Sequence, residues 1–134
     1  MTHPLTLLVV DDDPEIRAYV RRTLETLCPF VGAIREAESG QRALDMVREG
    51  GVDGLVTDVQ LPGLDGLTLC RALDAEGDGV IPVLLISGES SRAGDAQQFA
   101  AGARHRAFVS KPFNAHQLST ALKQLVDNCQ ESSD

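Results

Sequence analysis

The chain has 134 residues, 43% of them hydrophobic, which suffices for a single domain with an ordinary buried core. Its formal net charge of −8 argues against nucleic acid as a direct partner, because such binding relies on Lys and Arg, and the 12 basic residues are scattered. Cys28, Cys70 and Cys129 are far apart and outside any CxxC pattern, so they indicate neither a disulfide framework nor a zinc site. No signal-peptide pattern and no run of roughly 18 apolar residues is present, so we expect a cytoplasmic protein without membrane contact.

A strand followed by a helix is predicted at the start of the chain. The aliphatic run Leu5–Val10 is typical of a strand that is buried on both faces. Asp13 then has the character of a helix N-cap, because Pro14 stands at the first helical position. Apolar residues follow at helical spacing up to Pro29, where we expect the helix to end.

Two more pairs of strand and helix are predicted in the middle of the chain. Val31–Glu36 is a weak strand, and Gln41–Glu49 carries the apolar stripe of a short helix. Val52–Thr57 is predicted as the third strand, and a loop dense in turn residues, Leu61–Gly66, leads to the third helix. The apolar face of that helix consists of Leu67, Leu69, Cys70 and Leu73.

The last part of the chain continues the alternation. Val83–Ile86 is the strongest strand, and Ala93–Ala101 is a weak helix because Gly94 within it costs about 1 kcal/mol relative to alanine. Ala107–Val109 is the last strand, and Asn114 is predicted to cap the final helix. The apolar stripe of that helix consists of Leu118, Ala121, Leu122, Leu125 and Val126.

Five strands that alternate with five helices through short loops predict an α/β fold. We expect a doubly wound, five-stranded parallel sheet of the flavodoxin-like (βα)5 kind, in three αβα layers. The domain should cover residues 1–128, followed by a short polar tail over residues 129–134. Ligands of such sheets bind outside the carboxyl ends of the strands, so the polar residues that follow the strands should meet there.

Carboxylates at this edge predict a site for a divalent cation. Two or three of them cannot all stay ionised at low cost without positive charge nearby, and hard oxygen ligands suit magnesium. We expect Asp12 and Asp58 to be metal ligands, with Asp11 binding through water. Asp13, beside Pro14, is more simply a helix cap.

The same edge has the groups that phosphoryl transfer needs. The Asp58 carboxylate is a possible nucleophile toward phosphorus, which would give an aspartyl phosphate. Lys111 can neutralise a transferring phosphoryl group, and Ser87 can donate a hydrogen bond to one of its oxygens. Each of these residues alone is a weak signal, and their combination is the informative one.

Together these segments resemble the receiver domain of two-component response regulators, from Leu7 to about Val126. The matching segments are Leu8-Val9-Val10-Asp11-Asp12, Asp58 with Leu61-Pro62-Gly63-Leu64-Asp65-Gly66, Ser87, and Lys111-Pro112-Phe113. The resemblance implies that Asp58 is the phosphoacceptor and that the Gln60 backbone carbonyl joins the acidic pair as a ligand of Mg²⁺ or Mn²⁺. It also implies a cis Lys111–Pro112 bond and a donor phosphohistidine on a sensor histidine kinase or a histidine phosphotransfer protein.

The resemblance further implies a way to signal. In the family the hydroxyl residue, here Ser87, moves inward on phosphorylation, and an aromatic residue, here Phe108, follows it. This remodels the surface of the fourth helix, fifth strand and fifth helix, which we expect to be apolar, with Ala93, Ala96 and Ala100 as neighbours of Phe108. Gln60 and Glu89 occupy positions that tune how fast the phosphoryl group is hydrolysed. We expect a stand-alone receiver that controls an unknown protein, although a fragment of a hybrid kinase or larger regulator stays an alternative.

Three other functions compete with this interpretation. Asp11 and Asp13 form a D-x-D pair, so a haloacid-dehalogenase-like phosphohydrolase would use Asp11 as its nucleophile. A flavodoxin-like binding module would need a Gly-rich turn after the first strand, which this chain lacks. A receiver that has lost its chemistry and serves only as an interaction scaffold would not need the full set of acidic, hydroxyl and lysine residues.

Overall fold

The computed structural model describes residues 4–76, 81–88 and 105–131. Within this part of the chain, strands and helices alternate up to β4, and α5 follows β5. The elements are β1 (Leu5–Val10), α1 (Pro14–Leu27), β2 (Val31–Ala37), α2 (Gly40–Glu49), β3 (Gly54–Asp58), α3 (Gly66–Glu76), β4 (Val83–Ser87), β5 (Arg106–Ser110) and α5 (Ala115–Glu131). The helix expected at Ala93–Ala101 lies outside the described residues.

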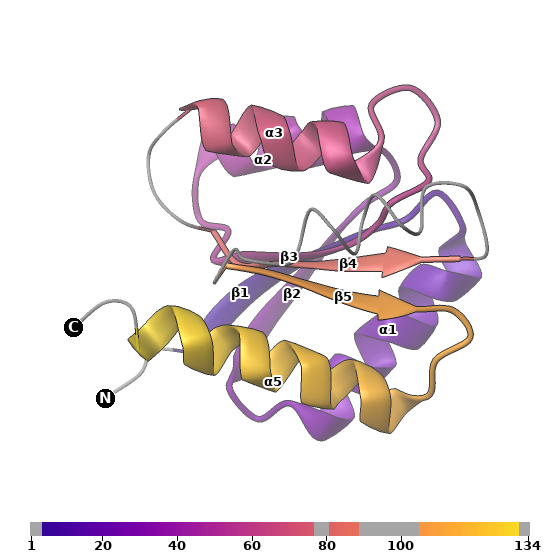
Figure 1. The fold of residues 1–134 in the computed structure, drawn as a ribbon, viewed down its shortest axis with the longest axis vertical. Helices are drawn as coiled ribbons and strands as arrows, with labels where there is room; N and C mark the ends of the chain where they lie inside the picture. The colour runs from indigo at the N-terminus through magenta and orange to yellow at the C-terminus, as the bar shows by residue number, and fades with distance from the viewer. Residues whose placement is uncertain (1–3, 77–80, 89–104, 132–134) are drawn as a thin grey trace.

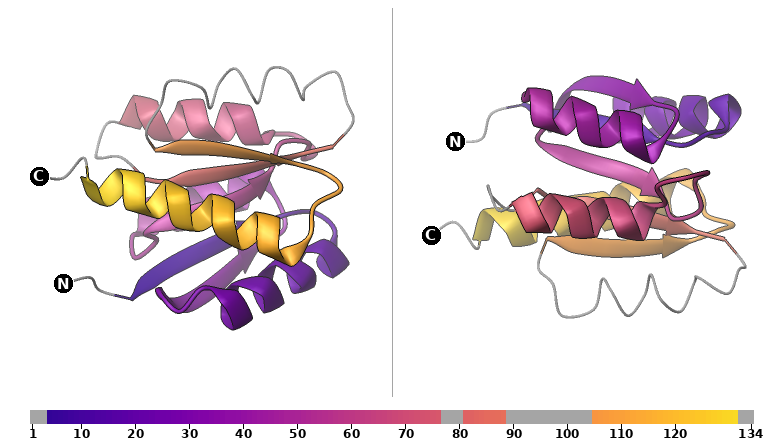
Figure 2. Two further views of the ribbon diagram at one scale, coloured as in Figure 1. Left: turned by 60° about the horizontal axis from the view of Figure 1, so that its bottom comes forward. Right: turned by 90° about the horizontal axis from the view of Figure 1, so that it is seen from above.

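The strands form one sheet in the order β2-β1-β3-β4-β5, and every pair is parallel. Figure 1 shows three layers, with α2 and α3 on one side of the sheet and α1 and α5 on the other. The two turned views in Figure 2 show the same arrangement. The predicted doubly wound α/β fold is therefore confirmed.

The period of two along the strands produces a core on each face of the sheet. In β1, Leu8 and Val10 pack on the face covered by α2 and α3, whereas Leu7 and Val9 pack on the face covered by α1 and α5. Every residue of the central strands β3 and β4 is buried. This explains why these strands are continuous apolar runs rather than alternating ones.

Two of the predicted helix caps are present. The Asp13 side chain accepts a hydrogen bond from the Glu15 amide at 2.9 Å, which confirms it as the N-cap of α1. Before α5, the Asn114 side chain accepts from the Gln117 amide and the Gln117 side chain accepts from the Asn114 amide, at 2.8 and 2.9 Å. This reciprocal pair fixes where α5 begins.

The observed elements differ from the predicted ones mainly at their ends. β3 ends at Asp58 and β4 at Ser87, so these two polar residues are the last residues of their strands rather than the first residues of loops. α5 continues to Glu131, past the expected end of the domain at residue 128. Among the described helices, none combines the length and apolar character that crossing a membrane requires.

Candidate functional site

The polar residues predicted to converge do meet at the carboxyl edge of the sheet. Asp58 lies opposite Ile86, the residue before Ser87, and Ser87 lies opposite Ser110, the residue before Lys111. On the other side of β3, Thr57 lies opposite Val10, which precedes Asp11. The sheet register therefore places four distant segments of the sequence side by side.

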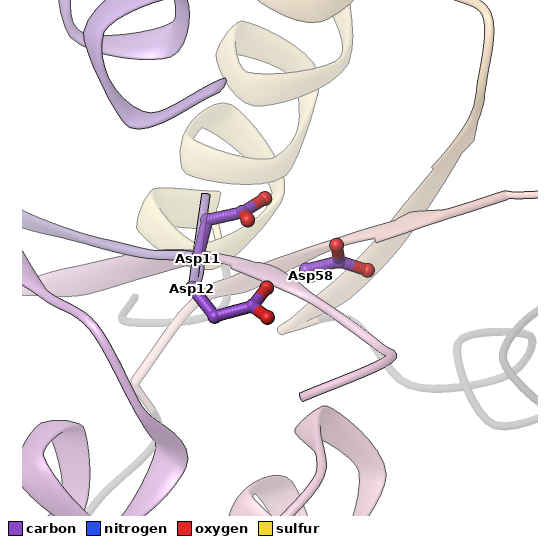
Figure 3. Close-up of side chains that lie close together, drawn as sticks. All are labelled: Asp11, Asp12 and Asp58. Carbon is purple, nitrogen blue, oxygen red and sulfur yellow. The ribbon is translucent and has the colours of Figure 1, made fainter. Parts of the chain in front are cut away.

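Three carboxylates cluster at this edge. One oxygen each of Asp11, Asp12 and Asp58 lies within 4.8 Å of the others. Asp11 and Asp58 are only 3% and 6% exposed, whereas Asp12 faces solvent. Figure 3 shows these three side chains gathered where β1 and β3 end.

Each buried carboxylate is oriented by a backbone amide of its own loop. The Asp11 carboxylate accepts from the Asp13 amide at 2.9 Å, and the Asp58 carboxylate accepts from the Gln60 amide at 3.0 Å. The second oxygen of Asp58 accepts from Lys111 Nζ, also at 3.0 Å. Lys111 thus reaches from the end of β5 to the end of β3, as an ammonium that bridges two strands.

The electrostatics of the cluster are unbalanced. The pKa of Asp11 is raised from 3.8 to about 6, mainly by burial. The neighbouring carboxylates of Asp58 and Asp12 contribute to this rise, and the Asp13 amide and Lys111 oppose it. Three carboxylates therefore share one lysine at the end of a buried sheet. A small set of hard, partly buried oxygens with excess negative charge fits a divalent cation such as Mg²⁺.

Ser87 and Lys111 are joined through the backbone. The Lys111 amide donates to the Ser87 carbonyl at 2.7 Å. Ser87 is fully buried, and its hydroxyl donates to the Gly88 carbonyl at 3.3 Å. The peptide bond between Lys111 and Pro112 is cis, as the family resemblance implies.

Phe108 lies half-buried on β5, opposite Leu85 on β4. Its ring packs into the core between the sheet and the α2–α3 layer. Two residues further along, Ser110 lies opposite Ser87, so Phe108 and Ser87 face the same side of the sheet on adjacent strands. Glu89, Ala93, Ala96 and Ala100, which the sequence placed near the site, are outside the described residues.

Gly66, the first residue of α3, lies directly against the phosphoacceptor candidate. A Cβ atom at this position would be 2.5 Å from the Asp58 carbonyl oxygen and 2.9 Å from the Val59 Cα. The Gly66 amide donates to the Val59 carbonyl at 2.9 Å. This close approach is possible only because glycine has no side chain.

Sequence reasoning did not identify Arg17 as part of the site. Its Nη1 donates to the backbone carbonyl of Asp11 at 2.7 Å. The available signal was its place one helical turn after the Asp13 cap, where a long side chain can fold back over the preceding loop.

Known proteins with similar sequences and folds are receivers. The family model described as the response regulator receiver domain matches residues 7–123. The response regulator MprA of Mycolicibacterium vanbaalenii is 35% identical over 124 residues, which cover 92% of this chain and 51% of MprA. The chain therefore spans about half the length of the curated relatives it matches.

Two solved structures illustrate the likeness of the fold. The response regulator receiver protein from Sinorhizobium medicae is 28% identical with a TM-score of 0.71, over 92% of this chain and 94% of that one. The chemotaxis response regulator CheY4 of Vibrio cholerae is 26% identical with a TM-score of 0.74, over 90% of this chain and 98% of that one.

Proposed function

The chain belongs to the response regulator receiver domain family, a family of signalling domains, and from this membership we propose that Asp58 accepts a phosphoryl group. One observation carries the proposal most directly. Asp58 has a carboxylate oxygen 3.0 Å from Lys111 Nζ and lies in a cluster with two further carboxylates. A nucleophile, a balancing ammonium and the ligands for a cation are thus adjacent.

The proposed transfer starts from a phosphohistidine. A carboxylate oxygen of Asp58 bonds to phosphorus as the phosphorus–nitrogen bond of the donor breaks, and the histidine nitrogen keeps that electron pair. Lys111 balances negative charge on the phosphoryl oxygens, and the Ser87 hydroxyl turns from the Gly88 carbonyl to donate to one of them.

We assign Mg²⁺, or Mn²⁺, to Asp12, Asp58 and the backbone carbonyl of Gln60, with Asp11 binding through a water molecule. When bound, the cation supplies positive charge to the phosphoryl oxygens. The support for this assignment is the cluster of three carboxylates and the raised pKa of Asp11, because a cation would stabilise the ionised form of that buried group.

Intact mass spectrometry after incubation with acetyl phosphate and Mg²⁺ tests the phosphoacceptor. We expect one phosphate adduct on the wild-type protein and none on Asp58→Asn. Asp13→Asn is the matched control, since asparagine also caps a helix and Asp13 lies outside the cluster, so its adduct should remain. An adduct that persists in Asp58→Asn and disappears in Asp11→Asn would contradict the proposal and favour the phosphohydrolase alternative.

We propose that a protein donor docks beside the site along α1. Tyr19, in the second turn of α1, is 38% exposed, and its ring centroid lies 6.0 Å from that of Phe113, which follows Lys111-Pro112. Tyr19 and Ala115 line a pocket of about 220 Å³ with mostly apolar walls. We expect Tyr19→Ala to slow phosphorylation by a sensor kinase and to leave phosphorylation by acetyl phosphate unchanged; equal slowing of both would contradict the docking role.

We propose that Phe108 reports the phosphorylated state to a downstream protein. The support is its position beside Leu85, two residues along the strand from the Ser87–Ser110 pair, on the same face of the sheet. Amide chemical shifts in β5 and α5 should change when beryllofluoride, a mimic of the aspartyl phosphate, is added, and Phe108→Ala should remove that change. Val109→Ala, which packs on the opposite face, should retain it. An unaltered response in Phe108→Ala would end this role.

The lifetime of the phosphoryl group is proposed to depend on Gln60 and Glu89. Gln60 is exposed, and its backbone amide donates to the Asp58 carboxylate, so the residue is adjacent to the proposed phosphorylation site. Substituting Gln60 with alanine should change the rate at which the adduct is lost, and an unchanged rate would remove this residue from the proposal.

A further inference from the structure

Arg17 holds the loop that presents the acidic pair, and no step proposed above uses this residue. Two different nitrogens of its guanidinium each donate one hydrogen bond. Nη1 donates to the Asp11 carbonyl at 2.7 Å, and Nε donates to Glu36 Oε1 on β2 at 3.1 Å. The Arg17 side chain is only 18% exposed, and its bond to the Asp11 carbonyl is part-buried, so water competes less for this bond than for the exposed one to Glu36.

The peptide unit that Arg17 binds is the one that carries Asp12. The Asp11 carbonyl and the Asp12 amide belong to one rigid plane, and the orientation of that plane sets the direction in which the Asp12 side chain leaves the backbone. The neighbouring groups of the loop are held by other bonds. The Asp11 amide donates to the Ala37 carbonyl at 3.2 Å, and the Asp13 amide donates to the Asp11 carboxylate at 2.9 Å. Among the described residues, Arg17 is the side chain that binds the peptide plane between Asp11 and Asp12.

We infer that Arg17 is a positioning residue that sets the distance of the exposed Asp12 carboxylate from the buried carboxylate of Asp58 before any ligand binds. The expected effect of Arg17 on Mg²⁺ binding rests on the proposed function, whereas its expected effect on the order of the loop does not. The role needs the fork of an arginine, because one nitrogen binds the Asp11 carbonyl while another binds Glu36. A lysine would have to bind both acceptors from one nitrogen, without the two separate, rigidly held donors of the guanidinium.

Arg21 offers a matched control on the same helix. Its Nη1 donates to Glu36 Oε2 at 2.8 Å and its Nε donates to Glu25 at 3.3 Å, so it shares the acceptor of Arg17. Its described contacts do not include the Asp11 carbonyl. Replacing Arg21 with methionine therefore removes its surface ion pairs with Glu36 and Glu25 and leaves the contact between Arg17 and the loop in place.

The first measurement uses the metal-free protein. Amide hydrogen exchange followed by NMR should show the hydrogen-bonded Asp11 and Asp13 amides exchanging several-fold faster in Arg17→Met and at the wild-type rate in Arg21→Met. Urea unfolding of both variants measures their global stability. If Arg17 had only a structural role, the free energy of unfolding would fall in each variant. An increase in exchange that is confined to the loop separates positioning from a general loss of stability.

The second measurement is the affinity for Mg²⁺ alone, by calorimetric titration. Arg17→Met should bind Mg²⁺ about tenfold more weakly, as is typical when a group that orients a ligand is lost, whereas Arg21→Met should stay within about twofold of wild type. Arg17→Lys retains the charge and should be as weak as Arg17→Met. If a variant with methionine at position 17 does not fold, Arg17→Lys carries the test.

Two results would overturn the inference. Wild-type Mg²⁺ affinity in Arg17→Lys would show that charge, and not the fork, matters. Equal losses in Arg17→Met and Arg21→Met would show that the Glu36 ion pairs alone are responsible. Neither result bears on the phosphoacceptor, which fails only if wild-type protein takes no phosphate on Asp58.

Discussion

Buried charge is compensated differently at the two ends of the strands, here called the amino edge and the carboxyl edge of the sheet. At the amino edge, the Arg106 side chain is only 2% exposed, and its two terminal nitrogens are matched by acceptors, whereas Nε has no hydrogen-bond partner. Nη2 donates to Asp74 on α3 at 2.6 Å, and Nη1 donates to the carbonyls of Ile81 and His105 at 2.8 and 3.0 Å. At the carboxyl edge, three carboxylates share the single ammonium of Lys111.

This difference separates structural charge from functional charge. A buried ion is tolerated when partners compensate for its lost hydration, as at Arg106. An uncompensated cluster lowers stability, and such local violations are expected where a protein binds or reacts. The unbalanced charge at the carboxyl edge therefore supports the site proposed there, and the comparison can be tested by removing charges at either edge.

The largest expected change in the free energy of unfolding comes from removing the buried charge at the amino edge. Arg106→Met keeps the apolar stem but removes the Arg106 donor of the Ile81 carbonyl and the cation that pairs with Asp74, whereas the His105 carbonyl still accepts from the Val83 amide. We expect the free energy of unfolding to fall by about 2.5 kcal/mol, because a part-buried carbonyl loses a donor and the ion pair with the half-exposed Asp74 is lost. Urea unfolding measures this, and a loss below about 1 kcal/mol would mean that the amino edge does not depend on Arg106.

The same experiment at the carboxyl edge should have the opposite sign. Asp11→Asn keeps an acceptor for the Asp13 amide and removes a buried negative charge, so without Mg²⁺ at pH 8 it should stabilise the protein by about 2 kcal/mol. The folded protein holds the Asp11 proton up to pH about 6 and the unfolded chain only to about 3.8. The wild-type penalty is thus present above pH 6 and fades as the pH falls toward 3.8, and the advantage of the variant should fade with it. If Asp11→Asn is less stable than wild type at pH 8, the Asp11 carboxylate does not carry the inferred unfavourable charge.

Magnesium should stabilise through one edge only. A ligand that binds only the folded state at ten times its dissociation constant adds about 1.4 kcal/mol to the free energy of unfolding. We expect this gain for wild type and for Arg106→Met, and none for Asp12→Asn. A gain that survives in Asp12→Asn would place the cation elsewhere.

The smallest effect is expected at an exposed contact of the amino edge. The Asp53 carboxylate accepts from the Thr6 amide at 2.8 Å, in contact with solvent. Asp53→Ala should therefore lower the free energy of unfolding by only about 0.5 kcal/mol in urea, because water can replace the lost acceptor. A much larger loss would show that the amino edge is more cooperative than its separate bonds indicate.

The parts of this molecule that follow from periodicity were predictable. Continuous apolar runs and helical stripes locate the elements, and the rule that parallel strands meet at their carboxyl ends brings Asp11, Asp58 and Lys111 together. Strand ends were less predictable. Asp58 and Ser87 were read as residues after their strands, because the end of a strand depends on backbone bonds to a neighbour that the sequence does not identify.

The contacts of Arg106 and Arg17 were not predictable for a different reason. The partners of Arg106 lie 32 and 25 positions away, at Asp74 and Ile81, and a charged residue beside an apolar run looks like a surface residue until the fold is known. Arg17 binds a backbone carbonyl, which every residue has. Sequence patterns identify side-chain chemistry well, and they identify side-chain contacts with the backbone poorly.

The contact between Gly66 and the Asp58 carbonyl has a consequence for anyone who selects mutants. Alanine at position 66 would have to displace the backbone of Asp58, the proposed phosphoacceptor, because its Cβ would stand 2.5 Å from the Asp58 carbonyl oxygen. A genetic screen for signalling-defective alleles should therefore recover substitutions of a residue that has no side chain and takes no part in the chemistry. Such alleles would map the shape of the site rather than its reactive groups.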